Sequence, residues 1–101
     1  MRTLGFTLMT AALMGGGLAL QADAQDAKLE RNLAATCVTC HGKHATTTGI
    51  LEGMPKDQLI QTMRAFKSGA RPATLMHQLS KGYSEQQVAM IAEYFSKQKA
   101  K

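Results

Sequence analysis

Two cysteines and a histidine lie close enough in the sequence to act on one cofactor. Cys37 and Cys40 are the two cysteines of the chain, and His41 follows directly. In a C-x-x-C-H pattern the spacing of the thiols matches the two vinyl groups of a haem, so each sulfur forms a thioether. The adjacent imidazole then becomes an axial ligand of the iron. The pattern therefore predicts one covalently attached haem c, bound through Cys37 and Cys40 with His41 on the iron.

Three other uses of the cysteine pair fit the sequence less well. A thioredoxin-like redox pair requires a βαβ unit, and no strand pattern occurs in the chain. A structural zinc site requires two more ligands at suitable spacing, and there is no second cysteine pair. A plain disulfide would explain neither the adjacent His41 nor the character of the first 24 residues.

Residues 1–24 have the pattern of a secretory signal peptide. A short basic start precedes an apolar run over residues 4–20, and Ala22-Asp23-Ala24 supplies the small residues of a cleavage site. The rival interpretation, an uncleaved membrane anchor, is disfavoured because the run is short and contains three consecutive glycines. We expect cleavage after Ala24, a mature domain of residues 25–101 without a membrane span, and export to an oxidising bacterial periplasm.

The apolar periodicity after residue 24 predicts helices only. A first helix is expected over Asp26–Thr36 with Asp26 as N-cap, followed by a loop over 42–54. A second helix opens at Pro55 and stops at Ser68-Gly69, a short helical segment covers 73–80, and the last helix begins with a capping box at 84–87. Its apolar face consists of Val88, Ile91, Ala92 and Phe95. The predicted class is all-α, with helices packed around one haem.

The domain after residue 24 has few large apolar side chains for a core of its own. Small domains of this kind usually need a stabilising element besides their hydrophobic core, and a covalently bound haem can supply it. We therefore expect the chain without haem to be largely unfolded, as in metal-dependent small domains.

The second axial ligand of the iron has several candidates. They are Met54, Met63, Met76, Met90, His44 and His77. Met63 and Met90 lie on the apolar faces of predicted helices, where methionine usually fills the core. Met76 lies in the short segment between the longer helices, which can cross the far face of the haem, so we predict Met76 as the ligand. His77 is then expected to be exposed or near the propionates, and His44 to lie on the surface.

Three runs of the sequence resemble those of a known family. The runs at residues 65–76 (AFKSGARPATLM), 81–87 (KGYSEQQ) and 91–95 (IAEYF) resemble the cytochrome subunit of flavocytochrome c sulfide dehydrogenase, within the class I cytochromes c. The resemblance covers essentially all of residues 25–101. It implies a small class I cytochrome c fold with an orthogonal pairing of the first and last helices, and Met76 as axial ligand.

The resemblance also implies partners. An FAD-containing sulfide dehydrogenase subunit would form a heterodimer with this chain and pass electrons to its haem, and another cytochrome would accept them downstream. The chain would then not be catalytic alone. The alternative is a freely diffusing shuttle between a quinol-oxidising complex and a terminal acceptor. A small peroxidase would need an open iron position, which Met76 closes.

One departure from the family concerns the loop after the haem motif. The family usually has a proline there, whose carbonyl accepts the Nδ1–H of the axial histidine. The matching residue here is Gly49. Since any backbone carbonyl can accept, we expect His41 to keep this hydrogen bond within a less rigid loop.

The basic charge can be placed relative to the haem. The chain has 12 Lys and Arg against seven Asp and Glu, a net charge of +5. Arg71 is predicted to pair with a haem propionate because guanidinium suits planar carboxylates, whereas Lys67 and Lys81 are expected to be solvated. A basic surface favours an acidic protein partner. Nucleic acid is excluded as a partner because no basic stripe interleaved with aromatics occurs.

Overall fold

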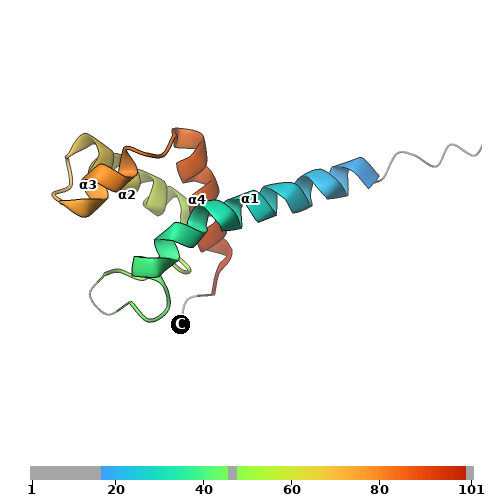
Figure 1. Cartoon of the computed structure of the whole chain (residues 1–101), viewed down its shortest axis with the longest axis horizontal. Helices are drawn as coiled ribbons and strands as arrows, with labels where there is room; N and C mark the ends of the chain where they lie inside the picture. Colours follow the sequence, from blue (N-terminus) through green and yellow to red (C-terminus); the bar gives the residue numbers. More distant parts are fainter. Residues whose placement is uncertain (1–16, 46–47, 100–101) are drawn as a thin grey trace, which may run out of the picture.

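The computed structural model describes residues 17–45 and 48–99, with side chains from Ala24 onward. These described residues form four helices, labelled in Figure 1: α1 (Gly17–His41), α2 (Lys56–Ser68), α3 (Leu75–Ser80) and α4 (Glu85–Lys97). No strand occurs among the described residues. The predicted all-α class is therefore confirmed.

Helix α1 is longer than the sequence predicts. It was expected over Asp26–Thr36, but it runs from Gly17 to His41, so Asp26 lies in its interior and is not its N-cap. The physical reason is that residues 18–28 are mostly good helix formers without Gly or Pro, so nothing ends the helix there. Consequently the whole haem motif lies in the last turns of α1, and the predicted cleavage site lies within the helix.

The ends of the other helices follow local signals. Gly69 ends α2 in the left-handed conformation with φ of 84°, and Pro55 precedes α2 as its N-cap rather than opening it. The predicted capping box of α4 is confirmed: the Gln87 amide donates to Ser84 Oγ at 3.1 Å, and the Ser84 amide donates to Gln87 Oε1 at 2.9 Å. These caps fix where α2 and α4 end and begin.

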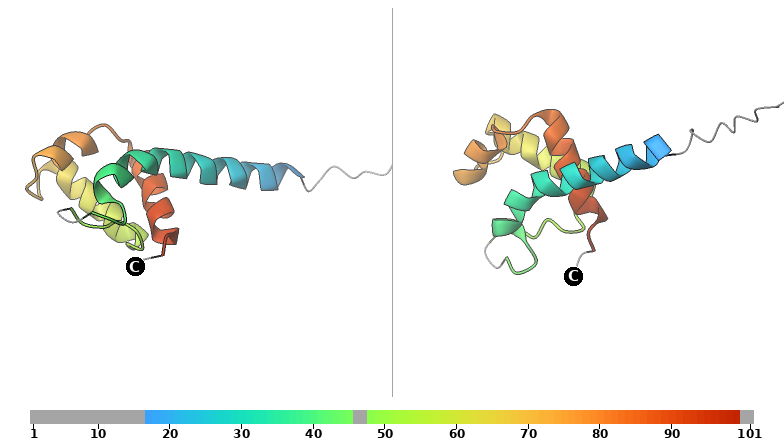
Figure 2. Two further views of the ribbon diagram at one scale, coloured as in Figure 1. Left: turned by 60° about the horizontal axis from the view of Figure 1, so that its bottom comes forward. Right: turned by 45° about the vertical axis from the view of Figure 1, so that its right-hand side comes forward.

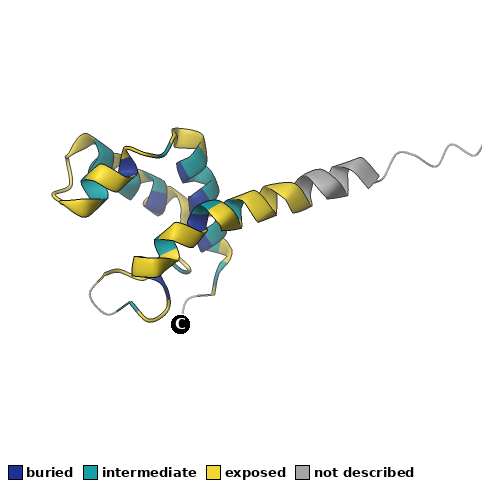
Figure 3. Cartoon of the chain, viewed as in Figure 1, coloured by how far each residue is buried: buried dark blue, intermediate teal, exposed yellow. Residues whose placement is uncertain are grey.

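The core forms where α4 crosses α1 and packs against α2 (Figures 2 and 3). Its fully buried apolar residues are Ala34, Leu59, Ile91, Ala92 and Phe95. Ala34 and Ala92 are both 0% exposed, and such small side chains allow two crossing helices to approach closely. The expected crossing of the first and last helices and the predicted apolar face of α4 are thus confirmed.

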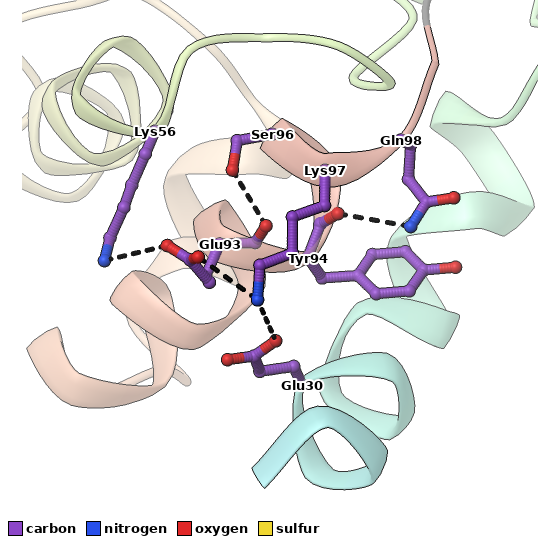
Figure 4. Close-up of polar contacts among 7 residues, drawn as sticks. All are labelled: Glu30, Lys56, Glu93, Tyr94, Ser96, Lys97 and Gln98. Carbon is purple, nitrogen blue, oxygen red and sulfur yellow. Dashed lines mark hydrogen bonds and ion pairs between the residues drawn. The ribbon is translucent and has the colours of Figure 1, made fainter. Parts of the chain in front are cut away.

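Ion pairs join the same three helices at the surface (Figure 4). Lys97 Nζ lies 3.2 Å from Glu93 Oε1 and 3.6 Å from Glu30 Oε2 of α1. Lys56 Nζ of α2 lies 3.1 Å from Glu93 Oε2. The hydrogen bonds from Lys56 and Lys97 hold the pKa of Glu93 below its ordinary value. The network therefore ties α1 and α2 to the end of α4.

No helix in the described part of the chain combines the length and the apolar character needed to cross a bilayer.

Candidate haem-binding site

The last turns of α1 bring the motif residues onto one side of the helix. Cys37, Cys40 and His41 are three and four residues apart, the spacing at which helical side chains are neighbours. Cys37 packs against the core and its burial raises the pKa of its thiol, while Cys40 is exposed. No disulfide joins them, so the helix presents two sulfur nucleophiles beside one imidazole.

The ring of His41 is held by the loop that follows α1. Its Nδ1 lies 2.6 Å from the carbonyl oxygen of Gly49, which confirms the expected hydrogen bond. A carbonyl can only accept, so Nδ1 carries a proton, and in the neutral ring Nε2 then keeps its lone pair. Neutral imidazole with a free Nε2 lone pair is the form that binds a metal. The loop thereby leaves Nε2 of His41 available for a metal.

Further hydrogen bonds to main-chain carbonyls fix this loop. Thr48 Oγ1 donates to the carbonyl of Cys40, and the Leu51 amide donates to the carbonyl of His41 at 3.4 Å. The Gly53 amide donates to the carbonyl of Phe95 at 2.9 Å, which attaches the loop to α4. The position of the Gly49 carbonyl therefore depends on both α1 and α4.

A glycine is required directly after the motif. Gly42 is buried, and a Cβ on it would lie 2.7 Å from the carbonyl oxygen of Val38. That oxygen belongs to the backbone of the haem motif and cannot move away independently. Gly42 thus allows the chain to turn off α1 while leaving the motif undisturbed.

Met76 lies on a different element from the motif. It is half-buried on α3, which packs on α2, whereas α1 packs on α4. Its neighbours Leu75 and Leu79 are 62% and 48% exposed, while Ser80 is 1% exposed. Figures 1 and 2 show α3 and the C-terminal end of α1 at the same end of the molecule.

The other candidate ligands have different surroundings. Met54 and Met63 pack against the core, and His44 is exposed in the loop after α1. His77 is half-buried, and its Nδ1 lies 2.7 Å from the carbonyl oxygen of Phe66 on α2. This contact was missed from the sequence, because a backbone acceptor has no residue signature. The assignment of Met76 as ligand remains a prediction.

Two of the basic residues have specific contacts. The Arg71 guanidinium lies 5.0 Å from the centre of the Phe66 ring, and Arg71 is exposed. Lys67 was expected to be solvated, but it is half-buried and its Nζ donates to the carbonyl of Tyr83 at 2.8 Å. The correction arises because the loop before α4 lies over the end of α2. Lys81 is exposed, as expected.

The residues present fit a haem. Two cysteines one turn apart would attach the porphyrin through thioethers, and His41 and Met76 would offer a nitrogen and a sulfur to the iron, which is the donor set of a c-type haem. Apolar side chains that could cover a porphyrin are exposed on the loop and α3, namely Ile50, Leu75 and Leu79. Together with the all-α fold, this donor set defines the class of protein as a c-type cytochrome.

The comparisons with known proteins agree with that class. The chain is 33% identical over 82 residues to cytochrome c-554(548) of Halomonas halodenitrificans, covering 74% of this chain and 99% of the relative. No family model matches the sequence. The chain belongs to the cytochrome c family, so its cofactor is haem and its activity is electron transfer.

Two further relatives are named for dehydrogenases of sulfide and of thiosulfate. The chain is 30% identical over 66 residues, 62% of its length, to the cytochrome subunit of sulfide dehydrogenase of Chlorobaculum tepidum. It is 37% identical over 71 residues, 65% of its length, to the thiosulfate dehydrogenase electron acceptor of Thiomonas intermedia. The chain spans 60% of the first relative and 33% of the second.

Proposed function

We propose that this chain is an exported monohaem cytochrome that accepts electrons as the cytochrome subunit of a sulfide-oxidising flavoprotein. The observation that carries the proposal is its similarity to the cytochrome subunit of sulfide dehydrogenase. The similarity to the electron acceptor of a thiosulfate dehydrogenase supports the same general role, reception of electrons from a dehydrogenase of reduced sulfur. Another cytochrome is proposed as the downstream acceptor.

Each ligand residue has a distinct role in this proposal. Cys37 and Cys40 form the thioethers, and His41 Nε2 and Met76 Sδ are the axial ligands. When bound, the haem supplies a one-electron iron couple. The Gly49 carbonyl holds the His41 ring in the orientation and tautomer needed for ligation. A methionine thioether raises the reduction potential, which suits an electron acceptor. Arg71 is proposed to pair with a propionate.

A site closed by two protein ligands transfers electrons without binding a substrate. Sulfide oxidation to elemental sulfur releases two electrons, whereas one haem takes up one at a time. The partner must therefore store two electrons and release them singly, which a flavin can do. For this reason we place sulfide oxidation on an FAD-containing partner subunit and assign this chain electron uptake only.

The proposed export signal and haem attachment are tested by the mass of the purified protein. Intact-mass spectrometry should give residues 25–101 plus one haem, with an N-terminus at Gln25. A mass that includes residues 1–24 would contradict cleavage, and a mass without haem after denaturation would contradict covalent attachment.

The axial ligand is tested with a pair of methionine variants. Met76→Ala should lose the weak near-infrared sulfur-to-iron charge-transfer band of the ferric protein. Met90→Leu is the matched control, because Met90 is a half-buried methionine on α4. Retention of the band in Met76→Ala would refute the assignment.

The partner is tested by purification from the native source and by stopped-flow kinetics. A stoichiometric flavoprotein that reduces the ferric haem on addition of sulfide would support the subunit role. Purification as a lone small protein, with reduction of its ferric haem by sulfide no faster in the presence of such a flavoprotein, would instead support a diffusing shuttle. That second candidate is favoured by one observation: the chain spans 99% of a relative described simply as a cytochrome.

A further inference from the structure

Helix α3, which carries Met76, is too short to hold its own orientation. It consists of six residues, Leu75–Ser80, and helices far below about 12 residues are not stable in isolation. Its orientation must therefore come from its packing on α2. The side chains that make this packing decide where Met76 points.

His77 makes a side-chain hydrogen bond from α3 to α2. Its Nδ1 donates to the carbonyl oxygen of Phe66 at 2.7 Å. That carbonyl lies in the last turn of α2, where backbone oxygens lack intrahelical partners, and it also accepts the Gly69 amide at 3.2 Å. Ser80, the buried residue of α3, donates its Oγ to the carbonyl of His77 at 3.2 Å within the same helix.

This bond fixes the rotation of α3 about its own axis. Successive residues of an α-helix are about 100° apart. The His77 ring contacts α2 and Ser80 is buried, whereas Leu75 and Leu79 lie on the exposed side of α3. Met76 lies at the boundary between the packed and the exposed side. If α3 rotated, Met76 would move to the packed or to the exposed side.

We propose that His77 is a positioning residue, which holds α3 against the end of α2 and thereby directs Met76 toward the iron. The inference rests on the proposed function, since it takes Met76 as the axial ligand. His77 does not touch the iron in this proposal; it acts through the rotation of α3.

The test is a titration of the ferric holoprotein with imidazole, which competes with Met76 for the iron. His77→Leu removes the hydrogen-bond donor and should strengthen apparent imidazole binding about fivefold to tenfold, as expected for the loss of one hydrogen bond. His77→Asn places an amide N–H near the position of Nδ1, so it should restore binding to within about twofold of the wild type. If His77→Leu gives no holoprotein, His77→Ser replaces it in the same titration.

Arg64→Gln is the matched control. Arg64 pairs with Glu85 at 2.8 Å, which joins α2 to α4 rather than to α3, so its loss should leave imidazole binding unchanged. The inference is overturned if His77→Leu binds imidazole as the wild type does, if His77→Asn behaves like His77→Leu, or if Arg64→Gln shifts binding equally. Failure of the ligand assignment has a different signature: Met76→Ala would then keep the near-infrared band.

Discussion

Truncation of Phe95 should remove a large part of the stability of the fold. Phe95 is 0% exposed and lies in the cluster formed by α1, α2 and α4. Phe→Ala changes at buried sites cost about 3–5 kcal/mol, against a total of about 5–15 kcal/mol for a small domain. At about 4–8 °C per kcal/mol for a domain of this size, Phe95→Ala should lower Tm by roughly 12–40 °C.

The assay is thermal unfolding of the holoprotein followed by far-UV circular dichroism. Leu29→Ala is the control, because Leu29 is a large apolar residue of α1 that is 48% exposed. Its Tm should change by only a few degrees, since exposed substitutions stay within about 0.5 kcal/mol. Equal shifts in the two variants would refute the reasoning that the helix crossing at Phe95 carries the stability.

Three further predictions concern the motif, the acid limit and the chain without haem. A Cβ on Gly42 would lie 2.7 Å from a backbone oxygen, so Gly42→Ala should cost about 1–3 kcal/mol in a thermal melt, whereas Gly49→Ala, with no atom within 4 Å, should be neutral. Because lysine hydrogen bonds lower the pKa of Glu93 from about 4.5, its stabilisation is present above that pH and is lost as the pH falls through the lowered pKa. Tm should thus fall more steeply on acidification in the wild type than in Glu93→Gln, and parallel curves would contradict this. Without haem, Cys37 and Cys40 should be alkylated at equal rates, because we expect that chain to be unfolded; faster labelling of the exposed Cys40 than of Cys37, whose pKa is raised by burial, would show instead that it is folded.

The features predicted correctly from the sequence are those decided within a few residues. The capping box at Ser84 depends on one turn of chain, and the end of α2 depends on Gly69 and its positive φ. The hydrogen bond from His41 to Gly49 was also predictable, since a carbonyl is present whatever the side chain. Local chemistry was sufficient in each of these cases.

The features that were wrong or missed depend on more distant chain. Asp26 has the chemistry of an N-cap, but helix formers on both sides carry α1 past it. His77 and Lys67 donate to backbone carbonyls 11 and 16 residues away. Such acceptors carry no signature in the sequence, so these contacts become visible only when α2, α3 and the loop before α4 are placed in space.

The two proposed axial ligands, His41 and Met76, are held in place by different parts of the fold. His41 is held through Gly49 by a loop whose Gly53 amide bonds to Phe95, so its support belongs to the crossing of α1 and α4. Met76 is held through α3 on α2, which joins the rest of the fold through α4. A substitution that disrupts the crossing of α1 and α4 should therefore unfold the whole protein. A substitution that disrupts the α2–α3 contact should loosen only Met76. If Met76 is the ligand, as proposed, the reduction potential should respond to changes at the α2–α3 contact while the histidine side stays intact.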